Sequence, residues 1–190
     1  MVPCILKYDG EVDRYIGDAI LAKFGANERH PDHARRAVFA MIEMIETCDA
    51  LDEELRAEGQ PIIRMGAGAT TGPAILGNLG TPEHMEHTII SGAAIVASRA
   101  QDLTKEFGWD ILISEATYEQ AKDSIEVGEP WSIEPVTGLT ELRQRYESLA
   151  RIYPVLGRKG DVSPGRRQAY DALRREGRSI YADFYESPPT

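Results

Sequence analysis

Two short apolar runs separated by a Gly-Asp pair stand at the start of the hydrophobic pattern. Residues 10–25 read GEVDRYIGDAILAKFG, and their aliphatic and aromatic residues are types that favour β-strands. Gly-X is a two-residue signature of a type II′ hairpin turn, because glycine adopts a positive φ without strain. The pattern therefore predicts a β-hairpin that turns at Gly17 and Asp18 and leaves the Asp18 carboxylate at its tip.

Helical spacing follows the hairpin. The apolar positions of the next segment recur mostly every three or four residues: Val38, Met41, Ile42, Ile45, Leu51 and Leu55. Gly59 comes directly after this stripe, where a helix commonly ends. The segment is predicted to be an amphipathic helix with one face in the core.

Residues 61–81, PIIRMGAGATTGPAILGNLGT, predict a strand, a glycine-rich bend and a second strand. The glycines do not fit a phosphate-binding loop, because such a loop must open a helix, and here an apolar run follows. Glycines within strands mark bends or a close backbone approach. Residues 87–91 predict a further strand and 92–107 a helix, and 109–121 predict a strand and a helix with Ser114 as its N-cap.

This order of elements predicts an α+β sandwich, with one helical layer on a mostly antiparallel sheet. The last part of the chain differs, because residues 158–185 are rich in arginine and carry a loose helical stripe through Tyr170 and Leu173. A solvated helix face explains this charge most simply, and a docking helix or coiled-coil stub is the alternative. We expect one domain over residues 1–157 and a helical tail over 158–190.

Charge and composition narrow the classes of function. The chain has 31 acidic and 21 basic residues, a balance that argues against nucleic acid as a partner. No apolar stretch approaches the roughly 20 residues of a membrane span, and the N-terminus lacks a signal-peptide pattern. Cys4 and Cys48 form no disulfide framework, so we expect a reducing, cytoplasmic environment.

Four motifs, in order and spacing, carry a resemblance to a known family: GEVDRYIGDAILAKFG, DHARRAV, GAGATTGPAILGNLGT and HTIISGAAIVASRAQDLTKEFGWDILISEATYE. Residues 8–120 resemble the class III adenylate and guanylate cyclase catalytic domain. The resemblance implies a ferredoxin-like nucleotidyl cyclase sandwich, an antiparallel-rich sheet with helices on one face. It implies conversion of ATP, rather than GTP, to cyclic AMP and pyrophosphate in signal transduction.

The resemblance also implies partners and site residues. Cyclase domains pack head to tail, so we expect a homodimer, or a heterodimer with another cyclase domain. Asp18 matches the second metal-binding aspartate of a two-ion Mg²⁺ or Mn²⁺ site. Arg14 stands at the position of a purine-reading lysine, and Thr88 stands at the other purine-reading position. Arg99 matches the arginine that stabilises the transition state.

Three departures from the family pattern concern activity. Only 17 residues precede Asp18, so we expect the family's first strand, with the first metal aspartate, to be missing and the domain to be N-terminally incomplete. Ile95 replaces the asparagine that orients the ribose, and an apolar side chain offers no hydrogen bond. The family's phosphate-binding lysine has only Lys159 as a weak counterpart. These departures predict an impaired cyclase domain; the alternative is a non-enzymatic module that dimerises or binds nucleotide.

Overall fold

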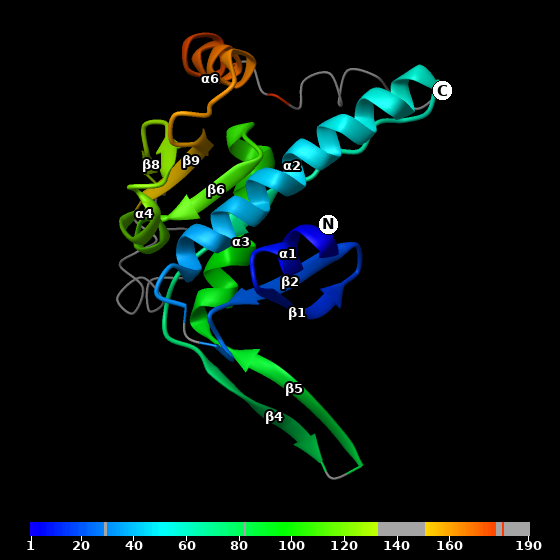
Figure 1. Ribbon diagram of the computed structural model, residues 1–190, viewed down its shortest axis with the longest axis vertical. Coiled ribbons are helices and arrows are strands. Elements are labelled where there is room, and N and C mark those ends of the chain that lie inside the picture. Colours follow the sequence, from blue (N-terminus) through cyan, green and yellow to red (C-terminus); the bar gives the residue numbers. More distant parts are fainter. Residues whose placement is uncertain (29, 82, 133–150, 178–179, 181–190) are drawn as a thin grey trace.

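The chain forms three β-sheets with helices packed around them, as seen in the part of the chain that the structure describes (Figure 1). This computed structural model describes residues 1–190 except 29, 82, 133–150, 178–179 and 181–190. Two of the sheets are antiparallel hairpins: β1 (Gly10–Ile16) with β2 (Ala19–Phe24), and β4 (Ile75–Thr81) with β5 (His84–Ile90). The third sheet forms the centre of the fold.

The central sheet has five strands, ordered β3-β6-β9-β7, with β8 also paired to β9. Their bounds are β3 (Ala67–Ala69), β6 (Ile111–Ser114), β7 (Ile125–Val127), β8 (Trp131–Ser132) and β9 (Arg151–Arg158). Strands β3 and β6 are parallel, whereas β9 runs antiparallel to β6, β7 and β8. The predicted α+β class, with an antiparallel-rich sheet, is confirmed.

Five helices are described: α1 (Val2–Lys7), α2 (His33–Ala57), α3 (Gly92–Phe107), α4 (Glu115–Ala121) and α6 (Pro164–Glu176). The predicted caps are in place, because the Ser114 side chain accepts a hydrogen bond from the Thr117 amide at the start of α4. Gly59, with φ +70°, follows the end of α2 as predicted. None of these helices is both long and apolar enough to cross a membrane.

Two apolar clusters lie on opposite faces of the central sheet. One face packs against α2 and α4, and the alternate residues Ile111 and Ile113 of β6 belong to it. Leu112, between them, packs on the other face with Leu103 of α3 and Tyr170 of α6. Alternation along a strand produces this division. Helices therefore cover both faces of the sheet, with α3 and α6 on the second face, whereas the sequence predicted a single helical layer.

The apolar stripe of α2 ends earlier than the spacing predicted. Leu51 is exposed, whereas Cys48 and Asp52 are buried. The Asp52 carboxylate accepts the Ile63 amide at 2.8 Å and Nη1 of Arg64 at 2.6 Å. A buried carboxylate with these two donors replaces the expected leucine contact, because this end of α2 faces the segment before β3.

Helix α6 docks on the body of the protein, which corrects the interpretation of the arginine-rich segment as a solvated face. Tyr170 packs against Trp109 with ring centroids 5.5 Å apart. Arg166 binds Asp110 of the body through two hydrogen bonds of 2.8 Å. Further arginines of the segment pair with Glu46, Glu126 and Glu129. The division at residue 157 stays a prediction, although these contacts hold α6 against the central sheet.

Candidate functional site

The β1–β2 hairpin turns where the sequence predicts. Ile16 pairs with Ala19, and Gly17 and Asp18 form the two-residue turn between them. Gly17 has a φ of +62°, the conformation that favours glycine at this position. The Asp18 residue is exposed at the tip.

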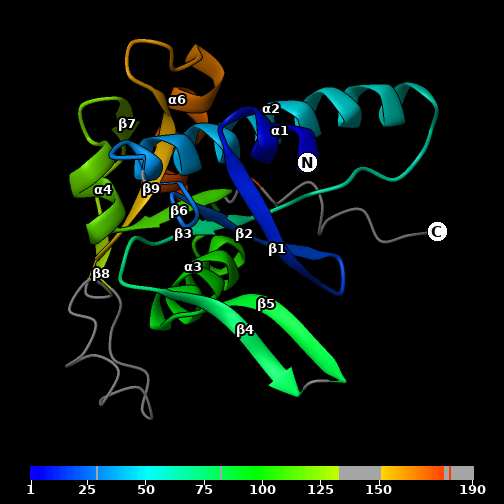
Figure 2. The ribbon, with the colours of Figure 1, turned by 60° about the horizontal axis from the view of Figure 1, so that its bottom comes forward.

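The β4–β5 hairpin forms an arm that projects from the body in both ribbon views (Figures 1 and 2). Its register pairs Gly77 with Thr88, near the end of the arm that leads into α3. Thr88 is buried, and its hydroxyl is in contact with the β1 strand of the other hairpin. The two hairpins therefore meet at the base of the arm.

Asp13 of β1 joins the hairpins. Its side chain has no exposed surface, and its carboxylate accepts four hydrogen bonds. Oδ2 accepts from the Thr88 hydroxyl at 2.8 Å and from Nε of Arg14 at 3.2 Å. Oδ1 accepts from Nζ of Lys23 and from the Ile89 amide, both at 3.1 Å. Both carboxylate oxygens are thus fully engaged by the protein.

These contacts keep the Asp13 carboxylate ionised. Burial alone would raise the pKa of Asp13, because it removes water from the charged form. The hydrogen bonds from Thr88, Lys23, Arg14 and the Ile89 amide outweigh burial, and the pKa is lowered. An ionised carboxylate accepts hydrogen bonds and donates none. At neutral pH, Asp13 is therefore purely an acceptor.

The structure brings together two of the four predicted site residues. Nη2 of Arg14 donates to the Thr88 hydroxyl, although 74 residues separate the two in the sequence. Asp18 lies at the hairpin tip. Arg99 lies on α3, where its Nη2 is 3.7 Å from Oε2 of Glu106. Ile95, one helical turn before Arg99, is 56% exposed, so the apolar replacement faces outward.

The sequence reasoning missed Asp13. A weak signal was present, because aspartate is depleted in strands and yet stands within a predicted strand, between Val12 and Tyr15. Its partner Thr88 lies 75 residues further along the chain, and only the folded structure shows their contact.

The hairpin suits a metal ion that a phosphate group helps to bind. Mg²⁺ is commonly held by one or two carboxylates together with substrate phosphates. Asp18 offers one exposed carboxylate, whereas the Asp13 carboxylate is saturated by its four donors. Within the described residues no group of three or more His, Cys, Asp or Glu side chains could hold an ion. Asp18 therefore fits a single ligand to Mg²⁺ or Mn²⁺, but not a complete protein site.

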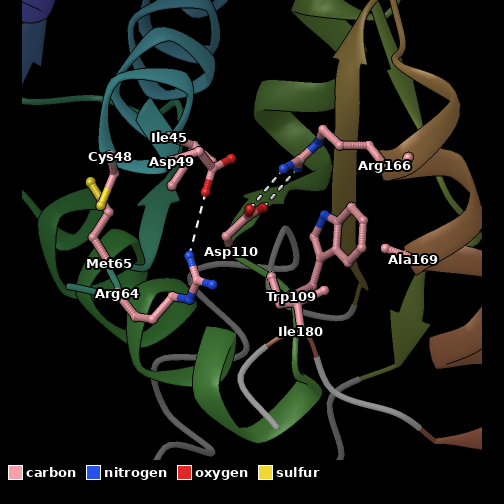
Figure 3. Close-up of a pocket in the computed structure, with 11 residues that line it drawn as sticks. Ile45, Cys48, Asp49, Arg64, Met65, Trp109, Asp110, Arg166, Ala169 and Ile180 are labelled. Carbon is pink, nitrogen blue, oxygen red and sulfur yellow. Dashed lines mark hydrogen bonds and ion pairs between the residues drawn. The ribbon is translucent and has the colours of Figure 1, made fainter. Parts of the chain in front are cut away.

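A second polar region surrounds a cavity of about 230 Å³ between α2, α6 and the residues directly before β6 (Figure 3). Asp110 and Arg166 lie across from each other there, and Nη1 of Arg64 lies 3.4 Å from Oδ1 of Asp49. Burial, followed by the neighbouring charge of Asp110, raises the pKa of Asp49. The described lining includes none of the four predicted site residues.

Comparisons of the sequence with known proteins found adenylate cyclases. No family model matches the chain. It is 32% identical to Adenylate cyclase 1 of Rhizobium meliloti (strain 1021) over 124 residues, which are 64% of the chain and 18% of that protein. It is 35% identical to an adenylate cyclase of Anabaena cylindrica over 108 residues, 56% of the chain and 21% of that protein. The chain spans about a fifth of the length of these curated relatives.

Solved structures of cyclases share the fold. The adenylyl cyclase CyaB from P. aeruginosa superposes with a TM-score of 0.70 at 27% identity, covering 85% of this chain and 79% of that one. The guanylyl cyclase Cya2 gives a TM-score of 0.67 at 25% identity, covering 83% of this chain and 75% of that one. The curated relatives and the solved structures together support a nucleotidyl cyclase catalytic domain.

Proposed function

We propose that the chain binds ATP and takes part in its conversion to cyclic AMP and pyrophosphate as one half of a head-to-tail cyclase dimer. The observation that carries this proposal is the contact between Arg14 and Thr88. Two polar side chains of suitable chemistry for a purine edge meet at the junction of the hairpins. The Arg14 side chain is 41% exposed, so its guanidinium is accessible to a ligand.

Each predicted residue has a role that suits its chemistry and place. Arg14 donates to the base and Thr88 accepts from it. Asp18 contributes one carboxylate to a Mg²⁺ or Mn²⁺ ion that the triphosphate also binds; the ion would activate the ribose 3′-hydroxyl. Arg99 supplies a positive charge to the transferring phosphoryl group, for which its partial exposure on α3 is suitable.

A second chain is needed in this proposal, because cyclase domains form their sites from the residues of two chains. Apolar side chains exposed on the arm and the first hairpin support such an interface: Tyr15, Ile16, Ile75, Leu79, Met85 and Ile90. Large apolar side chains left exposed in this number commonly mark a protein contact. A homodimer is the simplest assembly, and another cyclase domain is the alternative partner. The two free cysteines are consistent with a reducing, cytoplasmic location.

Ile95 lowers the expected activity of this chain. Its exposed side chain stands one turn before Arg99, and it gives the ribose no hydrogen-bond partner. One positioned hydrogen bond of this kind is worth about a factor of 10²–10³ in rate. The same observation favours the second candidate function, a module that binds nucleotide and dimerises without turning it over.

Complementation tests these two functions. The chain is mixed with a cyclase domain that carries both metal aspartates but lacks its own ribose-orienting asparagine and transition-state arginine. With ATP and Mn²⁺, we expect little cyclic AMP from the natural chain and roughly 10²-fold more from Ile95→Asn. Ile95→Leu is the matched control and should give no gain.

Binding is measured separately by calorimetry with ATP and Mg²⁺. ATP binding without product, even from Ile95→Asn, would support the non-enzymatic module. Failure of ATP to bind at millimolar concentration would contradict both functions. A gain from Ile95→Leu equal to that from Ile95→Asn would show that the lost hydrogen bond is not the cause of low activity.

A further inference from the structure

The buried carboxylate of Asp13 determines the direction of the Thr88 hydroxyl proton. A threonine hydroxyl has one proton to donate and two lone pairs that accept. Because Asp13 can only accept, the 2.8 Å contact between Thr88 Oγ1 and Asp13 Oδ2 uses that proton. Arg14 donates to the same Oγ1. The lone pair that remains on Thr88 Oγ1 can only accept a hydrogen bond, whereas Arg14, which is partly exposed, can only donate.

The carboxylate cannot easily turn away from this arrangement. Its other oxygen, Oδ1, is held by the backbone amide of Ile89 and by the buried ammonium of Lys23. The amide belongs to the residue directly after Thr88, so the carboxylate binds two consecutive residues of β5. Asp13 is therefore fixed relative to the hydroxyl by a backbone donor as well as by side chains.

Fixing the proton matters for the choice of purine. Adenine presents a ring acceptor beside an amino donor, whereas guanine presents a carbonyl acceptor beside a ring N–H donor, in the opposite order. A pair in which only one member donates distinguishes these orders for a base held in one orientation. A hydroxyl that is free to rotate accepts both orders and distinguishes them poorly.

We propose that Asp13 is a specificity-determining positioning residue, which holds the Thr88 hydroxyl as an acceptor and so makes the Arg14–Thr88 pair favour ATP over GTP. This inference rests on the proposed function, since it requires the base to lie against that pair. Asp13 itself is buried beneath the pair and acts through Thr88.

The test is a comparison of ATP and GTP affinities, measured by calorimetry with Mg²⁺ on the purified chain. A wrong pairing at one base edge commonly costs a factor of about 5–150 in affinity, so we expect the natural chain to prefer ATP at least fivefold. In Asp13→Asn, the new amide can donate to Thr88 and free its proton to point outward. The preference should then fall to less than about twofold.

Thr88 variants keep the test decisive if Asp13→Asn fails to fold. Thr88→Val removes the hydroxyl at nearly constant shape, and the preference should also fall to less than about twofold. Thr88→Ser keeps the hydroxyl and should keep the preference. Adding Asp13→Asn to Thr88→Val should change the preference no further, because Asp13 acts through the hydroxyl that is already absent.

Lys23→Met is the matched control for a general loosening of the hydrogen bonds around Asp13. It removes one donor from Asp13 and leaves the bond between Asp13 and Thr88, so it should lower the melting temperature and keep the preference. A preference that survives Thr88→Val, or that Lys23→Met abolishes as fully as Asp13→Asn does, overturns the inference alone. Failure of the natural chain to bind either nucleotide overturns the proposed function and this inference together.

Discussion

Arg14 and Arg166 each face a carboxylate. They differ in how many of their N–H groups donate to the protein. Arg166 donates to both oxygens of Asp110 at 2.8 Å, and also to the carbonyls of Leu156 at 2.9 Å and Val155 at 3.2 Å. Its guanidinium lies 4.9 Å from the centroid of the Trp109 ring. Arg14 shares its carboxylate with other donors and keeps 41% of its side chain exposed.

The difference separates a stabilising arginine from one that can bind a ligand. A guanidinium has five N–H groups, and Arg166 donates four hydrogen bonds to the protein. Burial alone would lower the pKa of Arg166, but the hydrogen bonds and the charge of Asp110, with the charges of other nearby carboxylates, outweigh it, so the pKa is raised and the charge is retained. Arg14 makes two hydrogen bonds to described residues and leaves the rest of its fork toward solvent. The number of N–H groups that already donate to the protein therefore distinguishes the two arginines, whereas their charge is the same.

The largest effect on stability is expected for Arg166→Met. The change leaves the mostly buried Asp110 carboxylate without its partner, which typically costs about 3–5 kcal/mol in the free energy of unfolding. Urea denaturation monitored by Trp fluorescence measures this loss. The double variant Asp110→Asn/Arg166→Met should lose clearly less than the sum of the single variants. Additive losses would mean that the pair itself contributes little.

For Arg14→Met we expect a large loss of affinity for ATP and only a small loss of stability. Affinity for ATP should fall about 10–100-fold, because a charge-assisted hydrogen bond contributes roughly 1.5–3 kcal/mol. The free energy of unfolding should change by less than about 1 kcal/mol, since the guanidinium is partly exposed. Calorimetry and denaturation of the same preparation give both values. A large loss of stability with unchanged affinity would make Arg14 a second structural arginine.

Local patterns predicted the elements of the fold better than their arrangement. The hairpin turn at Gly17, the helix over 92–107 and the Ser114 cap follow from neighbouring residues, and all three are confirmed. The docking of α6 could not be predicted, because it depends on Asp110, more than fifty residues before Arg166. Helical spacing shows that a segment has an apolar face, but it does not show which part of the protein packs against that face.

The residues of the candidate site could be identified from the sequence only through its resemblance to the cyclase family. Arg14, Asp18, Thr88 and Arg99 were matched by motif, and only Arg14 and Thr88 prove to be in contact. Asp13 was missed because a buried carboxylate is identified by its donors, and three of the four lie on Lys23, Thr88 and Ile89. The geometry of that cluster is a property of the folded chain.

A smaller effect is expected for Tyr170→Phe at the α6 junction. The Tyr170 hydroxyl accepts the Glu129 amide at 2.7 Å, and its loss should cost about 1 kcal/mol in the free energy of unfolding. The ring contact with Trp109 is retained. Tyr170→Leu, which loses that contact as well, should cost about 2–3 kcal/mol more by the same denaturation assay. Equal losses for the two variants would contradict the role of the ring.

The smallest effect concerns Asp32, before α2, and it depends on pH. The hydrogen bond from Arg36 lowers the pKa of Asp32 to about 2; burial opposes this effect, and a hydrogen bond from Arg35 adds to it. Because the folded-state pKa is depressed, the stabilisation is present above about pH 4 and is lost as the pH falls toward 2. Solvent reaches both partners, so Asp32→Asn should cost less than about 1 kcal/mol at neutral pH. The difference in melting temperature between Asp32→Asn and the natural chain should vanish near pH 2, whereas the exposed control Asp123→Asn should show little difference at either pH. A difference for Asp32→Asn that persists unchanged at pH 2 would contradict an ionic origin of this contact.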